Sequence, residues 1–87
     1  MKIKSDFLLK KVADQNVVVP TGNSVLNFNA AITLNETAAF LFEQLKEDCD
    51  EQTLIQRLTD EYAVDKKTAE DDVRVFLSVL KEHEILE

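Results

Sequence analysis

The sequence predicts an α+β fold, a three-stranded antiparallel sheet followed by three helices in a winged-helix-like arrangement. Two observations predict it. Extended, β-branched segments separated by turn residues fill the first third of the chain, and from Asn35 onward the spacing of apolar residues becomes helical. Strands and helices are therefore segregated, and because three strands are not stable alone, we expect the helices to cover one face of the sheet.

Three segments before residue 31 are predicted to be strands. The segment "FLLKKVA" (7–13) ends at the turn-forming cluster of residues 14–16, and "NVVVP" (16–20) ends at the turn-forming residues 20–23. The third, "SVLNFNA" (24–30), alternates, with Leu26 and Phe28 on one face and asparagines on the other. Two short turns predict an antiparallel meander, and the polar face of the third strand favours an edge position.

Three helices are predicted in the remainder of the chain, each preceded by a residue that can cap it. Asn35 precedes the helix 36–46, Asp50 precedes 51–62, and Asp65 precedes a helix that runs to about His83. The apolar residues expected on the inner faces of the first two are Ala38, Leu41, Phe42, Leu45, Leu54, Ile55, Leu58 and Tyr62. We expect the final apolar pair, Ile85 and Leu86, to pack onto the core.

The last helix carries more apolar residues than one buried face requires. On a helical wheel of about 100° per residue, one face gathers Ala69, Val73, Phe76, Leu77 and Leu80. Val75 and Val79 form a second, narrower strip beside Asp72 and His83. Either these valines pack within the fold or stand singly exposed, which is common, or they line a groove beside the edge strand. Such a groove would suit an extended peptide, which takes backbone hydrogen bonds from the strand and side-chain contacts from the helix.

The size and charge of the chain limit its function. Its 87 residues suffice for one small domain, 1–87, and leave little room for an enclosed active site. The net charge of −7 is uneven: residues 1–34 hold four lysines and two aspartates (+2), and residues 35–87 hold six basic and fifteen acidic residues (−9). The acidic part would repel a phosphate backbone and would suit a partner that carries Lys or Arg.

The sequence predicts a cytoplasmic protein. The N-terminus lacks the apolar run of a signal peptide, and no segment approaches the about 18 apolar residues of a membrane span. A lone cysteine, Cys49, cannot form an internal disulfide, which fits a reducing compartment.

Three groups of residues resemble the motifs of a known family. The first helix opens with Leu34, Asn35, Glu36, Thr37 and Ala38. The joint before the last helix contains Tyr62, Val64 and Asp65. The apolar series of the last helix and the chain end is Val73, Phe76, Leu77, Leu80, Ile85 and Leu86. In this order and spacing they resemble the PqqD-like family, the small proteins of pyrroloquinoline quinone biosynthesis and their relatives. The chain departs from that pattern where relatives often have glycine, at Ala38, after the first helix and at Glu84.

This resemblance implies a non-catalytic chaperone that binds the leader of a ribosomally made precursor peptide and presents it to a modifying enzyme, such as a radical S-adenosylmethionine protein. In the family the leader adds as a strand beside the third strand and rests against the last helix. Carried over to this sequence, the peptide-binding residues are Val25, Leu26, Asn27, Phe28, Asn29, Asp72, Val75, Val79 and His83. We expect a monomer or weak dimer, no cofactor, and a Kd of about 1 μM for so small an interface.

The sequence gives little support to catalysis or metal binding. His83 is the only histidine and has no identifiable nucleophile partner, and the carboxylates of Asp48 and Asp50 disfavour a reactive thiolate at Cys49. No Cys or His set has zinc spacing, and a calcium loop starting at Asp48 would place threonine where glycine and glutamate are required. We therefore expect no enzyme activity and no bound metal.

A winged-helix domain that binds DNA or a protein partner in transcription regulation is the alternative hypothesis. The last helix offers four basic residues, Lys66, Lys67, Arg74 and Lys81, but it also carries four acidic ones. Salt-sensitive retention on DNA would favour this alternative. Genes for a short precursor peptide and a radical enzyme beside this one would favour the peptide-binding hypothesis.

Overall fold

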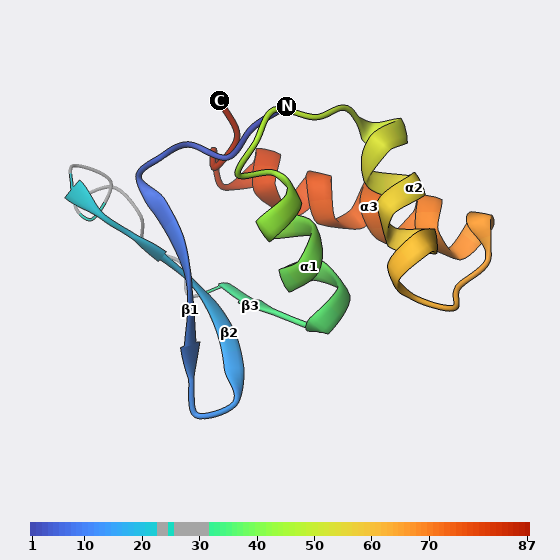
Figure 1. Ribbon diagram of the computed structural model, residues 1–87. Helices are drawn as coiled ribbons and strands as arrows, with labels where there is room; N and C mark the ends of the chain where they lie inside the picture. Colours follow the sequence, from blue (N-terminus) through green and yellow to red (C-terminus); the bar gives the residue numbers. More distant parts are fainter. Residues whose placement is uncertain (23–24, 26–31) are drawn as a thin grey trace.

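A computed structural model describes residues 1–22, 25 and 32–87. Its elements, in chain order, are β1 (Phe7–Val12), β2 (Gln15–Pro20), β3 (Ile32–Leu34), α1 (Glu36–Gln44), α2 (Glu51–Glu61) and α3 (Lys66–Glu82). The strands form one antiparallel sheet in the order β1-β2-β3, and the helices gather on one side of it (Figure 1). The predicted α+β fold, three antiparallel strands followed by three helices, is confirmed.

The hairpin between β1 and β2 turns one residue earlier than predicted. Val12 pairs with Gln15, so the loop is only Ala13 and Asp14, whose φ angles are 49° and 69°. Positive φ at both loop residues is the type I′ geometry, which matches the twist of the flanking strands. The prediction that Gln15 belongs to the turn is wrong, because it lies in β2; Asn16, which was counted both in the turn cluster and in the second strand, also lies in β2.

The third strand lies at Ile32–Leu34, a segment for which the sequence analysis predicted no strand. The predicted strand 24–30 lies outside the described residues except for Val25, which is exposed and belongs to none of the three strands. In β3, Ile32 and Leu34 are buried and Thr33 is exposed. Three residues are fewer than the four to eight over which an alternating pattern can be recognised, so the alternation in this segment is too short to predict a strand by itself.

The helices begin where the capping residues predicted. The Asn35 side chain accepts a hydrogen bond from the Ala38 N–H at 2.9 Å, and Asp50 accepts one from Thr53 at 2.7 Å. Asp65 also stands at the N-cap of α3, although its side chain makes no capping hydrogen bond. The buried face of α3 is the predicted one, namely Ala69, Val73, Phe76, Leu77 and Leu80. These residues pack into a core that includes Phe42, Leu54 and Val18.

The end of α3 is closed by a Schellman motif, which places the final residues on the core. The Ile85 N–H donates to the Leu80 carbonyl at 2.9 Å, and the Glu84 N–H donates to the Lys81 carbonyl at 3.2 Å. Ile85 is fully buried, and Leu86 packs against the core at half exposure, as predicted. The N-terminal segment lies alongside, with an isolated antiparallel bridge between Ile3 and Leu86, so that the two ends of the chain lie close together (Figure 1).

We expect Glu84→Gly to stabilise the protein by about 1 kcal/mol. Glu84 occupies the left-handed position of this motif with φ 56°, where a Cβ atom costs about 1–2 kcal/mol and glycine is the usual residue. Thermal unfolding should show a midpoint higher by about 4–8 °C, as 1 kcal/mol gives in a domain of this size. The matched control is Glu82→Gly, the last residue of α3, which should lower the midpoint; a rise in both variants would contradict the prediction.

Candidate functional site

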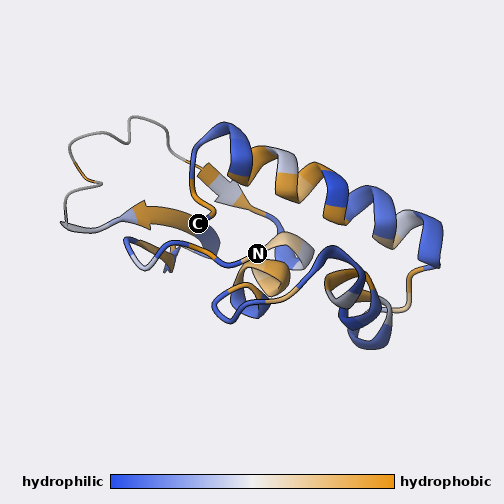
Figure 2. Ribbon diagram, turned by 90° about the horizontal axis from the view of Figure 1, so that it is seen from above, coloured by the Kyte–Doolittle hydropathy of each residue, from blue (hydrophilic) through white to orange (hydrophobic). Residues whose placement is uncertain are grey.

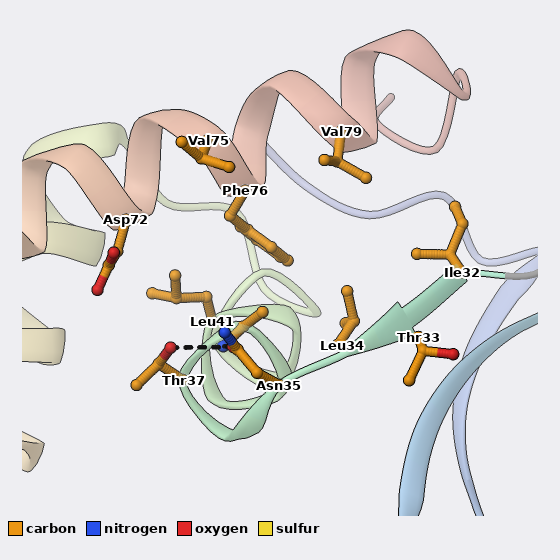
Figure 3. Close-up of a pocket in the computed structure, with 11 residues that line it drawn as sticks. Ile32, Thr33, Leu34, Asn35, Thr37, Leu41, Asp72, Val75, Phe76 and Val79 are labelled. Atoms are coloured by element: carbon orange, nitrogen blue, oxygen red, sulfur yellow. Dashed lines mark hydrogen bonds between the residues drawn. The ribbon is translucent and has the colours of Figure 1, made fainter.

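A groove of about 250 Å³ lies between β3, the beginning of α1 and α3 (Figure 3). Its lining residues are Ile32, Thr33, Leu34, Asn35, Thr37, Ala38, Leu41, Asp72, Val75, Phe76 and Val79. Figure 3 shows α3 along one wall and the edge strand β3 along the other. The site therefore combines the second apolar strip of the last helix with an edge strand. That strand is β3 at Ile32–Leu34, whereas the sequence predicted residues 24–30 for this role.

The groove is mostly apolar, and its apolar side chains extend from its base to its rim. Leu41, Phe76 and Leu34 are at most 7% exposed and belong to the hydrophobic core. Val75, on the rim, is 64% exposed, and Val79 is half-buried against the core. An exposed valine over a core-lined furrow leaves apolar surface that a bound chain would remove from water. Of the two interpretations left open for these valines, the structure favours the groove-lining one.

The register of the sheet determines which backbone groups of β3 face its outer edge. Because a two-residue loop joins Val12 and Gln15, these two form a hydrogen-bonded pair, and such pairs alternate along β2. It follows that Asn16 and Val18 direct their backbone groups toward β3, where they oppose Leu34 and Ile32. We infer that the N–H and C=O of Thr33, between those two residues, point to the outer edge. Among the described strands, none pairs with that edge.

Among the described residues that line this groove, Asp72 is the one with an acidic side chain. It is half-buried, and within the part of the chain that the structure describes it has no hydrogen bond or ion pair. The neighbouring Asp71 pairs instead with Lys67 at 3.5 Å and Arg74 at 3.2 Å. At the same end of the groove, the Asn35 side chain is already engaged by Ala38 N–H and by the Thr37 hydroxyl at 3.0 Å.

The predicted site residues are only partly brought together. Asp72, Val75 and Val79 line the groove, as the sequence analysis proposed. His83 is half-buried at the C-cap of α3 and is not part of the groove lining, and neither is the exposed Val25. The predicted residues 26–29 lie outside the described residues.

Several lining residues were not predicted as site residues. They include Thr33 in β3 and Thr37 in α1, while Leu34, Leu41 and Phe76 were assigned only to a family motif or the core. The short apolar–polar–apolar segment "ITL" directly before the Asn35 cap was the available signal for the strand wall.

The surroundings of Cys49 do not favour the thiolate that a nucleophilic cysteine needs. Burial raises the pKa of its thiol, outweighing the opposing effect of Arg57; the Asp48 and Asp50 carboxylates raise it further but are smaller causes. The carboxylates were the cause expected from the sequence, whereas burial is the main cause. Within residues 1–22, 25 and 32–87 no group of three or more His, Cys, Asp or Glu side chains could hold a metal ion. Over the same residues, no helix has the length and apolar character needed to cross a bilayer.

This protein is therefore a small α+β domain with a groove on its surface, between an edge strand and an apolar helix strip, instead of an enclosed site. The chain belongs to the PqqD family: the family described as Coenzyme PQQ synthesis protein D (PqqD) matches residues 16–86. A comparison with curated protein sequences gives no match.

Two solved structures are similar to this chain over 93% or more of its length. The first, described as "TbiB1 in Complex with the TbiA(beta) Leader Peptide", has a TM-score of 0.76 and 25% identity, covering 100% of this chain and 95% of the other. The second, "Lasso peptide synthetase B1 complexed with the leader peptide", has a TM-score of 0.69 and 26% identity, covering 93% and 89%.

Proposed function

We propose that this protein binds the leader segment of a ribosomally made precursor peptide and presents the peptide to a modifying enzyme. The observation that carries the proposal is the groove between the outer edge of β3 and the strip formed by Val75 and Val79. Membership of the PqqD family supports it, and so do two similar structures that are complexes with leader peptides. The leader would add to the sheet as a strand beside β3.

Strand addition accounts for the form of the site. The outward N–H and C=O of Thr33 would pair with the backbone of the leader, which gives affinity without regard to sequence. Apolar leader side chains would enter the furrow over Leu41 and Phe76 and cover the exposed Val75. The leader must be ordered as it binds, so a Kd of about 1 μM is expected for this small interface.

The role we propose is non-catalytic. The described lining residues are mainly apolar, with two threonines, one asparagine and one carboxylate, and none of them form a pair arranged as nucleophile and base. Chemistry on the bound precursor would therefore come from a partner, such as a radical S-adenosylmethionine enzyme. The DNA-binding alternative gains nothing from the comparisons, and the acidic residues of α3 oppose it.

A titration of isotope-labelled protein with the precursor peptide encoded beside its gene tests the proposal. We expect amide signals of Thr33, Val75 and Val79 to shift at micromolar peptide, while those of the exposed Leu8 and Val12 on β1 stay unchanged. A leader peptide truncated from the precursor should give the same shifts. Unchanged groove signals at millimolar leader would overturn the proposed function.

A further inference from the structure

We propose that the groove selects leader segments in which a lysine or arginine precedes two apolar residues, in the pattern basic-x-apolar-x-apolar, with the basic side chain held by Asp72. This inference rests on the proposed function and specifies the class of peptide that the groove accepts. It follows from the state of the Asp72 carboxylate, from the spacing along α3 and from the direction of β3.

Asp72 lies in the groove without a counter-charge from the described residues. The two basic side chains of α3 that form ion pairs among the described residues, Lys67 and Arg74, contact the adjacent Asp71. Asp72 is half-buried, and its neighbours in the lining include Phe76, Leu41 and Thr37. Its charge therefore lies at a largely apolar surface, where it has no ionic partner among the described residues and water can hydrate it.

Docking of a peptide would remove that water. A carboxylate covered by a neutral, apolar chain loses hydration without replacement, which costs free energy, whereas a lysine or arginine of the peptide restores a charge-assisted hydrogen bond. The carboxylate thus penalises neutral segments as well as attracting basic ones, and both effects contribute to specificity. The net charge of −9 on residues 35–87 adds a longer-range attraction for basic peptides.

The spacing along α3 sets the pattern. At a rise of about 1.5 Å per residue, Val75 and Val79 lie about 4.5 and 10.5 Å beyond Asp72 along the helix axis. In a strand, side chains on one face recur at about 6.8 Å, twice the rise of one residue. A residue two positions after the basic one therefore falls between Val75 and Val79, and the residue four positions after it reaches just past Val79.

The direction of the peptide follows from the direction of β3. In Figure 3, β3 runs from Ile32 toward Asn35, and Asp72 lies at the Asn35 end while Val79 lies toward Ile32. Both existing pairings in the sheet are antiparallel, which is also the slightly more stable arrangement per residue. An antiparallel leader would enter at Asp72 and leave toward Val79, so its basic residue comes before its apolar residues.

Fluorescence anisotropy with three labelled twelve-residue peptides tests this inference. The first contains Lys-Thr-Val-Ser-Val, the second has Gln for the Lys, and the third has the five residues in reverse order. We expect the first peptide to bind about tenfold more tightly than either of the others, as one hydrogen bond to a charged group can give. In Asp72→Asn this preference should fall to about onefold, and in Asp72→Lys a peptide with Glu for the Lys should bind best.

Asp71→Asn is the matched control, because this neighbour carries the same charge on the same helix but is not part of the groove lining. It should keep the preference for the first peptide. Equal binding of all three peptides to the native protein, or a preference for the reversed one, would overturn the inference. Either outcome leaves the proposed function intact, since that function fails only if the precursor's own leader does not bind. Loss of the preference in Asp71→Asn as well would show a general charge effect and would also overturn it.

Discussion

The Val79→Asp variant is expected to bind the leader about 100-fold more weakly than the native protein, with a smaller loss of folding stability. Val79 lines the groove and is half-buried in the free protein, so the new carboxylate keeps access to water until a peptide covers it. Binding would then bury a charge beside apolar side chains, at a cost of about 2–3 kcal/mol. Anisotropy with labelled leader and thermal unfolding of the same samples measure the two effects.

Val75→Asp separates binding from folding more cleanly, because Val75 is 64% exposed and substitutions at such positions change stability by about 0.5 kcal/mol or less. The same change at Val12, which is 50% exposed on β1 and not part of the groove lining, is the control. It should leave binding unchanged. The contrary outcome has two parts: Val79→Asp loses stability and binding to the same degree, and Val75→Asp binds normally. That result would mean that Val79 acts only as a core residue.

The helical part of the fold was predictable because its signals are local and repeated. Asn35 and Asp50 form the capping hydrogen bonds expected of them, and the periodicity of α3 identified its buried face residue by residue. The sheet was less predictable. Ala13 at a positive φ carries none of the asparagine or glycine signal of a type I′ turn, and β3 is three residues long.

The same contrast holds for the candidate site, whose residues on α3 were predictable and whose other residues were not. Asp72, Val75 and Val79 could be identified because they lie within α3, where a helical wheel gives the directions of the side chains. His83 could not be placed by that wheel, since α3 ends at Glu82 and the backbone of His83 leaves helical geometry with φ −98° and ψ 9°. The opposite wall forms only when β3 and α1 pack beside α3. These elements are far apart in the sequence, so the spacing of residues along the chain does not predict that contact.

Replacing Thr33 by proline is expected to weaken leader binding by about ten- to a hundredfold without disrupting the sheet. Proline removes the N–H that we infer to point to the outer edge, and its ring occupies the position of the incoming backbone. The pairing with β2 should survive, because Thr33 opposes Val17 between the two hydrogen-bonded pairs made by Ile32 and Leu34. Thr33 is also exposed, so little core packing is lost.

Thr33→Val is the matched control, because it alters the side chain at the same position and keeps the N–H. It should bind the leader within about twofold of the native protein, since valine favours strands as threonine does. Ile32→Pro provides the converse case, because it removes an N–H directed at Val18 and should destabilise the sheet itself. Native affinity in Thr33→Pro would mean that the leader does not pair with β3 at this residue, and the apolar strip of α3 would then have to account for binding without strand addition.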